Sequence, residues 1–504
     1  MNIIPKPCEV IMSEGHFEVD TETVIDSRFY TDLLKMYIES TTGLKPQSGN
    51  GNNHIKLEIS SQMESSHKEG YILDIDDSGI GIRSGYEEGL FYGLQTFRQI
   101  LFIYGRSLPF CKIEDFPRFE YRGFMLDTCR HFFEVDMVLK MLDLCALLKL
   151  NTFHFHITED QGWRVEIEKY PLLTKIGSFR KETFIRGKSD NTPVQGFYTK
   201  EDIKKIAAYS EKLNIKIIPE FDLPGHFRSA IAAYPHLSCE EKQIEVDTRY
   251  GISKHIACAG KESTYVFIKD VLDELIDMFN TDMIHIGGDE APKGKWKQCP
   301  HCQEKIKKEG LSGEEDLQGF FINYIHRYLK EKNIKTITWN ESLKASNLDK
   351  EIIIQHWLDG FKRKNVIKGI NDGRRTILSD FFHFYLDHPY AAVPLRKTYR
   401  FNPLLKGIKK GNEKYIMGLE APLWTEYVSD ERRVHYMTFP RLAALSERAW
   451  SKHQVQDYSD FLNRLESFNK ILQSMQVDFP ALHQADVKGI KRFIQILQLI
   501  VRRQ

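Results

Sequence analysis

The chain has 504 residues, of which 41% are hydrophobic and 28% are charged, a composition typical of globular proteins. It carries 70 Lys and Arg against 70 Asp and Glu, so net charge favours neither nucleic acid nor an anionic membrane as a partner. The length allows two or three domains, one of which can be as large as a barrel.

The amino terminus and the cysteines bear on the compartment. The opening MNIIPKPCEVIMSEGHF has no apolar core of the kind that a secretory signal requires, and no apolar run approaches the length of a membrane span. Eight cysteines are scattered over the chain, a pattern typical of reduced thiols. We therefore expect a cytoplasmic protein with no membrane insertion. A mature extracellular protein cloned without its leader would show the same features.

Residues 1–116 are predicted to form a small α+β domain. Short alternating strands, YILDIDD and GIGIRS, are followed by GLFYGLQTFRQILFI, in which apolar residues recur at helical spacing. The seam is expected near Asp115-Phe116-Pro117, since the residue before a proline tends to leave helical geometry.

Residues 117–480 then alternate between apolar strands and amphipathic helices. Eight strand-like runs are RGFMLD, TFHFHIT, KIIPEFD, MIHIGGD, KTITWNE, IIIQHW, RTILSD and YIMGLEAPLW. Helical segments such as KEDIKKIAAYSEKLN lie between most of them. This repetition predicts an α/β fold whose catalytic domain is a (β/α)8 TIM barrel. An open doubly wound sheet is the alternative.

Residues 481–504 are predicted to form a helical tail. The segment VKGIKRFIQILQLIVRRQ has an apolar stripe with basic residues at both ends. A terminal helix that closes the barrel or forms a homodimer interface is one interpretation, and a basic helix on a membrane surface is the other.

The predicted strands end in polar or aromatic residues that a core would not favour. In a (β/α)8 barrel the carboxyl ends of the strands surround the active site. The residues expected around this mouth are Arg130, Glu159, Asp160, Asp222, His226, Asp289, Glu290, Trp339, Glu341, Trp357, Tyr385, Asp387, Trp424 and Glu426. A mouth with acids, an arginine and several indoles suits a sugar.

The segment IHIGGDE (284–290) is the strongest candidate for chemistry. Asp289 and Glu290 follow an apolar run and two glycines. Two carboxylates crowded into a poorly hydrated pocket cannot both ionise easily, so one is pushed toward the protonated state near neutral pH. The glycines allow other groups to come close to the backbone.

The adjacency of the two acids limits the mechanism. A glycosidase usually places two carboxylates on opposite sides of the bond, whereas neighbouring residues of a strand point in different directions. The pair therefore suits a reaction in which a 2-acetamido sugar supplies its own nucleophile, the amide oxygen. One carboxylate would hold the amide N–H and the other would protonate the leaving group.

The barrel resembles that of the family 20 glycoside hydrolases, the β-N-acetylhexosaminidases. The matching stretches, in the family's order, are RGFMLDTCRHF (122–132), KLNTFHFHITEDQGWR (149–164), FYTKEDI (197–203), IIPEFDLPGH (217–226), IHIGGDEAP (284–292), TWNE (338–341), FYLD (384–387) and APLWTE (421–426). The stretches IIPKP (3–7) and GLFYGLQTFRQIL (89–101) resemble its smaller α+β domain.

The resemblance implies substrate-assisted hydrolysis with retention, through an oxazolinium intermediate. Glu290 would protonate the leaving oxygen and later activate water. Asp289 would accept the acetamido N–H, and Tyr385 would hydrogen-bond the acetamido carbonyl. His226, in DLPGH, would sit behind the acid and help to set its protonation.

Further residues would bind the sugar. Arg130 would hold hydroxyl groups, although a surface salt bridge is the alternative. Asp387 and Glu426 are similarly placed to accept from hydroxyls. The pocket walls would come from tryptophans at strand ends, which in isolation would more often be core residues: Trp339, Trp357 and Trp424.

Two features depart from the expected pattern or stand outside it. The family commonly has two aspartates after H-x-H-x-[TV], whereas this chain has Glu159-Asp160; we expect activity to survive the extra methylene. Cys299-Pro-His-Cys302 has a metal-like spacing, but a structural zinc site commonly needs a second pair, and none is evident in the sequence. The prediction is therefore no metal and no cofactor. The glycines match no nucleotide-binding motif.

The sequence thus predicts an exo-acting β-N-acetylhexosaminidase that removes terminal GlcNAc or GalNAc from a glycan or glycoconjugate. A lacto-N-biosidase-like enzyme that releases a disaccharide is one alternative. A catalytically silent carbohydrate-binding barrel is the other, and it would lack the acids that are present here.

Overall fold

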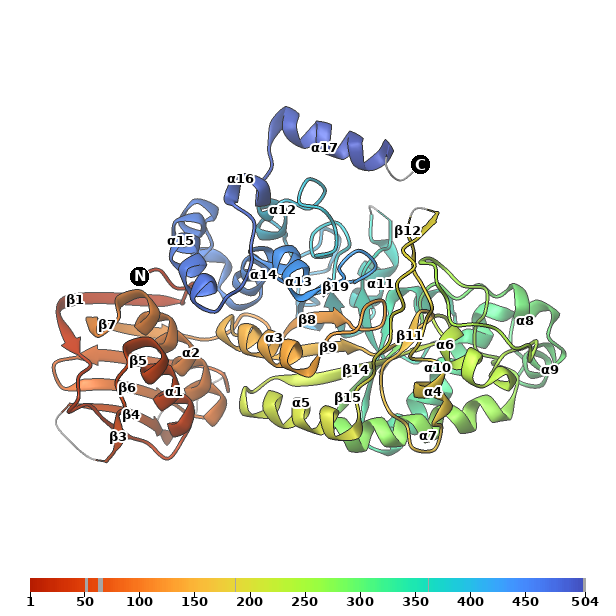
Figure 1. Cartoon of the computed structure of the whole chain (residues 1–504), viewed down its shortest axis with the longest axis horizontal. Coiled ribbons are helices and arrows are strands. Elements are labelled where there is room, and N and C mark those ends of the chain that lie inside the picture. Colours follow the sequence, from red (N-terminus) through yellow and green to blue (C-terminus); the bar gives the residue numbers. More distant parts are fainter. Residues whose placement is uncertain (50–52, 62–66, 186, 361, 502–504) are drawn as a thin grey trace.

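The computed structural model describes residues 1–49, 53–61, 67–185, 187–360 and 362–501. A small domain lies at one end of the long axis of the molecule, and a barrel occupies the rest (Figure 1). The small domain holds a seven-stranded sheet in the order β1-β7-β5-β6-β4-β2-β3. Its strands are β1 (Glu9–Glu18), β2 (Val24–Asp26), β3 (Gln47–Ser48), β4 (His54–Ile59), β5 (Tyr71–Asp76), β6 (Gly79–Ser84) and β7 (Ser107–Asp115).

Two helices accompany this sheet, α1 (Thr31–Thr42) and α2 (Glu87–Tyr104). Helix α2 packs against the sheet on one side and against helices of the barrel domain on the other. All thirteen residues from Gly89 to Leu101 are buried, which explains why this stretch is apolar nearly all round.

The barrel is closed and consists of eight parallel strands in the order β14-β15-β16-β17-β18-β19-β8-β9. The strands are β8 (Tyr121–Asp127), β9 (Thr152–His156), β14 (Lys216–Leu223), β15 (Met283–Gly287), β16 (Lys335–Trp339), β17 (Ile353–His356), β18 (Thr376–Leu378) and β19 (Ile416–Leu423). All eight predicted strands are present. The prediction of a (β/α)8 barrel after a small α+β domain is confirmed, and the open-sheet alternative is wrong because the last strand pairs with the first.

Helices surround the barrel. They include α3 (Val135–Leu147), α5 (Lys200–Lys212), α7 (Glu262–Phe279), α10 (Glu314–Glu331), α11 (Lys364–Asn371), α13 (Glu431–Thr438), α14 (Arg441–Trp450) and α15 (Tyr458–Ser474). Short elements fill the connections: α4 (Leu172–Lys175), α6 (Arg228–Ala233), α8 (Gly294–Gln298), α9 (Pro300–Lys308), α12 (Leu395–Tyr399), β10 (Thr158–Glu159), β11 (Gly162–Trp163), β12 (Phe184–Ile185), β13 (Lys188–Ser189), and the 3₁₀ turns η2 (Pro235–Leu237), η3 (Asn340–Lys344), η4 (Glu413–Tyr415) and η5 (His453–Val455). Helix α5 shows how the sequence sets a boundary, because Thr199 and Asp202 form a reciprocal capping box at its start.

The barrel interior is layered. An apolar layer is formed by Tyr121, Ile218, Met283, Ile337, Ile353, Ile377 and Met417. A second layer is polar: the Glu220 carboxylate lies 2.8 Å from His285 Nδ1 and 3.2 Å from His154 Nε2, while Gln355 donates to Glu420. These groups are fully buried and bonded to one another, as buried polar groups must be. The polar layer supports the strand ends beyond it.

The chain ends in α16 (Leu482–Ala485) and α17 (Gly489–Val501), drawn in blue beside the barrel (Figure 1). Arg396 lies 2.7 Å from Asp486 and anchors the segment before α17. In the part of the chain that the structure describes, no helix combines the length and the apolar character that crossing a membrane would need.

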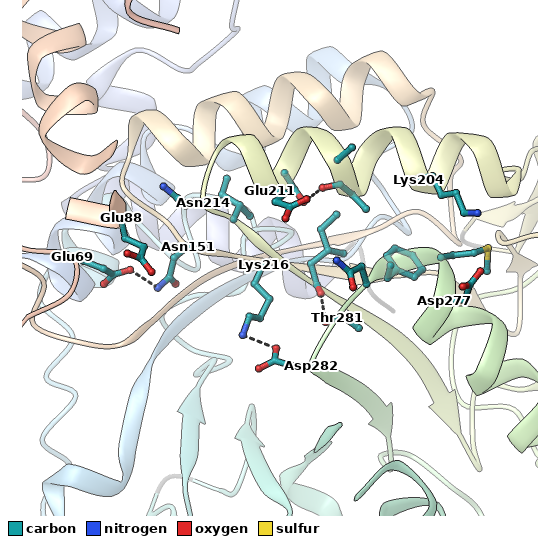
Figure 2. Close-up of a pocket in the computed structure, with 18 of the residues that line it drawn as sticks. Glu69, Glu88, Asn151, Lys204, Glu211, Asn214, Lys216, Asp277, Thr281 and Asp282 are labelled. Atoms are coloured by element: carbon teal, nitrogen blue, oxygen red, sulfur yellow. Dashed lines mark hydrogen bonds and ion pairs between the residues drawn. The ribbon is translucent and has the colours of Figure 1, made fainter. Parts of the chain in front are cut away.

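A hollow of about 790 Å³ lies where the small domain meets the amino ends of the barrel strands (Figure 2). Its wall includes Glu69 and Glu88 from the small domain, and Lys216 and Asp282 from the starts of barrel strands. Lys216 Nζ lies 2.5 Å from the Asp282 carboxylate. This end of the barrel is opposite the predicted active-site mouth.

Candidate active site

The carboxyl end of β15 brings the two adjacent acids into the mouth. Gly287 and Gly288 adopt φ angles of 65° and 99°. A Cβ on Gly287 would overlap the Asp222 carboxylate, and one on Gly288 would overlap the hydroxyls of Thr338 and Ser342. Only glycine allows this close packing with positive φ. The two glycines therefore let β15 end against its neighbours and present the acids that follow.

His226 lies between Glu159 and the two acids. Its Nε2 atom is 3.7 Å from Asp289 Oδ2 and 3.7 Å from Glu290 Oε2. His226 and Glu290 both have positive φ, 51° and 42°, a conformation that costs energy for residues other than glycine and that often occurs at functional sites. The structure thus brings together three of the residues selected from the sequence.

The environment raises the pKa of both acids. Burial raises the pKa of Asp289 to about 7, with the Glu220, Glu290 and Glu341 carboxylates acting in the same direction and His226 opposing them. Burial also raises the pKa of Glu290, which is more exposed than Asp289. Asp289 Oδ1 is buried and, among the described residues, has no hydrogen-bond partner. An amide N–H of a substrate could supply one.

Glu159 contacts the other ring nitrogen of His226, Nδ1. Its carboxylate accepts from His226 Nδ1 at 2.7 Å and lies 2.8 Å from Arg130 Nη2 and 3.2 Å from His156 Nε2. Burial would raise the pKa of Glu159, but Arg130 and His226 more than offset it and hold it well below its usual value. Burial would likewise lower the pKa of His226, yet the carboxylates around it, Glu159 first, hold it well above the usual value. Glu159 is therefore an ionised group that orients His226 and Arg130.

Aromatic side chains form one wall of the mouth. Tyr385 is stacked on Trp357 with ring centroids 6.2 Å apart. Burial raises the pKa of Tyr385 well above its usual value, so the phenol remains a proton donor. Trp339 is only 1% exposed, lies behind Trp424 with centroids 6.1 Å apart, and donates its N–H to Glu220.

Three polar residues lie on the Trp424 side of the mouth. Arg130 stacks over Trp424 at 4.9 Å and also contacts Asp127, so it is a nearly buried arginine and not a surface one. Glu426 faces Arg130 and Asp387; burial raises its pKa to about 7. Asp387 Oδ1 is buried and lacks a hydrogen-bond partner among the described residues. These acids are free to accept from hydroxyl groups.

Several supporting residues carry no role in the sequence predictions. Asp127 accepts from the Thr425 backbone and hydroxyl at 3.0 and 2.9 Å, which ties β8 to the end of β19. Asp222 lies under Asp289, and burial together with Asp289 holds its pKa well above the usual value. Glu341 accepts from the Glu290 backbone N–H at 3.4 Å. Their only sequence signal is their position at the end of a predicted strand.

Histidines and acids inside the barrel also form close groups, for example His154, Glu220 and His285. These imidazoles are already bonded to carboxylates, so the groups are explained without a metal ion. A separate group of four cysteines lies outside the mouth and is considered below.

Comparison with known proteins gives consistent matches. The model of the glycosyl hydrolase family 20 catalytic domain matches residues 119–453, and that of family 20 domain 2 matches residues 1–116. A β-hexosaminidase of Porphyromonas gingivalis is 35% identical over 93% of this chain and 62% of its own length, and one of Vibrio furnissii is 31% identical over 88% and 76%. The chain thus spans less than two thirds of the Porphyromonas relative.

Solved structures agree. The β-N-acetylhexosaminidase of Bacteroides fragilis is 30% identical with a TM-score of 0.84, over 97% of this chain and 99% of its own. The exo β-N-acetylglucosaminidase of Vibrio harveyi, solved with N-acetylglucosamine, is 29% identical with a TM-score of 0.85, over 95% and 78%.

Proposed function

The chain belongs to glycosyl hydrolase family 20, and from that premise we propose that it is an exo-acting, retaining β-N-acetylhexosaminidase. It removes terminal non-reducing GlcNAc or GalNAc from a glycan. The observation that carries the proposal is the arrangement of Asp289 and Glu290, which lie side by side with His226 Nε2 3.7 Å from each. Neighbours on one strand end cannot flank a glycosidic bond as acid and nucleophile.

The first step uses Glu290 as a general acid. Its raised pKa favours the protonated form. Glu290 gives its proton to the glycosidic oxygen while the C–O bond breaks. The acetamido carbonyl oxygen of the same sugar forms a bond to the anomeric carbon, and the product is an oxazolinium ion. In the second step Glu290 takes a proton from water, which attacks the anomeric carbon and opens the ring.

Asp289 and Tyr385 hold the acetamido group. Asp289 accepts the amide N–H through a carboxylate that is ionised during the reaction and stabilises the positive oxazolinium. Tyr385, whose phenol stays protonated, donates to the carbonyl oxygen. Two positioned groups on one amide favour the conformation in which the oxygen reaches the anomeric carbon.

The test is release of p-nitrophenol from the β-linked N-acetylglucosaminide, N-acetylgalactosaminide and plain glucoside. We expect turnover of the acetamido sugars and at least about 10²-fold less of the glucoside, since the latter lacks the amide oxygen. Comparable hydrolysis of the glucoside would contradict the mechanism. Binding of the acetamido sugars without turnover would indicate a silent barrel.

We also propose a homodimer in a reducing compartment such as the cytoplasm. None of the eight cysteines, all of which lie in the described part of the chain, forms a disulfide, which supports a reducing environment. Helix α17 exposes Ile490, Phe493 and Ile494, an apolar face that a second copy could cover. Light scattering after size exclusion, with Phe493→Glu as the variant, tests the dimer. A monomeric wild type would contradict it.

A further inference from the structure

Four cysteines that are far apart in the sequence meet beside the barrel. Cys239 and Cys258 lie in the segment between α6 and α7, while Cys299 and Cys302 lie at the start of α9. We call them the four-cysteine cluster. The sequence prediction of no metal assumed that Cys299 and Cys302 had no second pair, and the structure contradicts that assumption, because Cys239 and Cys258 supply it.

The distances between the sulfurs match a tetrahedral metal site. Cys258 Sγ lies 3.8 Å from Cys299 Sγ and 3.7 Å from Cys302 Sγ, and Cys239 Sγ lies 3.8 Å from Cys302 Sγ. All four sulfurs are within 4.8 Å of one another. A zinc ion with Zn–S bonds of about 2.3 Å at the centre of a regular tetrahedron places its sulfurs about 3.8 Å apart. A disulfide would need about 2.05 Å.

The surroundings of the cluster are also those of a closed structural site. Cys258, Cys299 and Cys302 are buried, and Cys239 is half-buried. Cys302 lies in the first turn of α9, where the helix dipole favours negative charge. Four mutually close sulfurs leave no position for a substrate, which distinguishes this site from a catalytic one.

We propose that the four-cysteine cluster binds one Zn²⁺ ion through four thiolates. Each thiol loses its proton on binding, so four protons are released and the site carries a net charge of 2−. Zinc suits the site because thiolate sulfur favours it over Mg²⁺, Ca²⁺ and Mn²⁺, and because zinc adopts tetrahedral geometry in structural sites.

The cluster joins the two loops that build the catalytic mouth. Cys239 and Cys258 follow β14, whose loop also carries His226, while Cys299 and Cys302 follow β15, whose loop carries Asp289 and Glu290. The loops already touch nearby: the Trp296 indole donates to the Ala257 carbonyl at 2.9 Å, and a Cβ on Gly260 would overlap the backbone at His301 and Cys302. The metal would act as a cross-link that fixes the relative position of the two loops. Its role is positioning, not chemistry.

The first test is the metal content of the full chain, purified from zinc-containing medium without chelator and measured by mass spectrometry of the elements. We expect about one zinc per chain. Cys239→Ser should reduce the zinc content about tenfold or more at equal protein concentration. The matched control is Cys8→Ser, which removes another half-buried thiol, outside the cluster, and should keep the zinc.

The second test needs no variant, so it is valid even if Cys239→Ser fails to fold. The wild-type chain is loaded with Co²⁺ in place of zinc, and its absorption spectrum is recorded. We expect the sulfur-to-cobalt charge-transfer band and the intense ligand-field bands of a four-sulfur tetrahedral site. A chain that takes up neither metal overturns the proposal, as do two disulfides within the cluster or zinc that persists in Cys239→Ser. None of these results depends on glycosidase activity.

Discussion

The two ends of the barrel shift the pKa of an aspartate in opposite directions. At the amino end of β15, Asp282 lies 2.5 Å from Lys216 Nζ (Figure 2). Burial would raise the pKa of Asp282, but Lys216 more than offsets it and the pKa lies below its usual value. At the carboxyl end of the same strand, burial raises the pKa of Asp289 to about 7. Strand β15 thus lies between Asp282, whose ionised form is stabilised, and Asp289, whose ionised form costs energy.

The difference lies in how charge is balanced. At the amino end, basic side chains form ion pairs with nearby acids: Arg122 pairs with Glu69, and Lys216 pairs with Asp282. At the mouth, acids crowd one another, and Asp222, Asp289 and Asp387 each keep a buried oxygen that has neither a hydrogen-bond partner nor an ion-pair partner among the described residues. Unbalanced, buried carboxylates are characteristic of a functional site. The electrostatics therefore identify the carboxyl end of the barrel as the functional end.

Glu290→Gln should have the largest effect. We expect kcat to fall by about 10²–10⁴-fold because the variant cannot donate the proton. The loss should be smaller for the p-nitrophenyl substrate than for a natural disaccharide, since p-nitrophenolate leaves without protonation. The control is Glu341→Gln, which removes the carboxylate that accepts from the Glu290 N–H and should retain most activity. Equal losses on both substrates would argue against an acid role.

Asp289→Asn should come next. The amide keeps the size of the side chain but removes the charge that stabilises the oxazolinium, so we expect kcat to fall by about 10²–10³-fold with a smaller change in KM. Steady-state kinetics on the p-nitrophenyl N-acetylglucosaminide would measure both. Tyr385→Phe, which removes the second contact to the same amide, should also affect kcat more than KM. A change confined to KM in both variants would contradict the proposed roles.

Asp289→Asn should also stabilise the fold at high pH. The Asp289 carboxyl has a pKa of about 7 in the folded chain and about 4 when unfolded. Between these values the folded state binds more protons, so stability falls as the pH rises through this window. Asp289→Asn avoids that loss and should raise the free energy of unfolding at pH 8 by about 1–3 kcal/mol, with no gain below pH ~4.

Asp282→Asn, at the amino end of β15, should change the stability with the opposite pH dependence to Asp289→Asn. Its folded pKa is lowered, so the wild-type carboxylate stabilises the fold above its unfolded pKa and loses that contribution as the pH falls. The variant should be less stable at pH 8, by under about 1 kcal/mol because the pair with Lys216 is partly exposed. Denaturant unfolding at pH 4 and pH 8 measures both variants. If both shift in the same direction, the contrast between the two ends is wrong.

Much of this contrast could be predicted from the sequence. The apolar runs gave all eight barrel strands, and barrel geometry then placed Asp289 at the mouth. The inner polar layer was not predicted, because a strand such as TFHFHIT does not reveal that His154 contacts Glu220 of the neighbouring strand β14 inside the barrel. The depth of Trp339 was also not predicted, since burial depends on what stacks above it.

The four-cysteine cluster could not be predicted from the spacing of the cysteines in the sequence. Cys299 and Cys302 are three positions apart, within one helical turn, so their proximity follows from local geometry. Cys239 and Cys258 are joined by 18 residues of mostly irregular chain, and nothing in their spacing brings them to α9. Only the parallel pairing of β14 with β15 brings the two loops together.

Glu159→Asp tests a finer point of the mouth. The glutamate reaches His226 Nδ1 at 2.7 Å and Arg130 Nη2 at 2.8 Å, and a side chain one methylene shorter cannot keep both contacts in place. We expect kcat/KM to fall by roughly tenfold, through displaced His226 and Arg130, together with an altered pH profile. A strongly increased kcat would instead show that the native glutamate compromises this enzyme.

Lys216→Ala should have the smallest effect and is the strictest test of the contrast. Lys216 and Asp282 are 41% and 44% exposed, so their pairing is screened by solvent, and its loss should change the free energy of unfolding by under about 1 kcal/mol. The change should shrink in 1 M salt, where screening is stronger. The pH profile of kcat/KM should stay unchanged, because the apolar and polar layers of the barrel lie between this pair and Asp289. A shifted profile would mean that charge at the amino end reaches the catalytic acids, and the two ends would then have to be treated as one electrostatic unit.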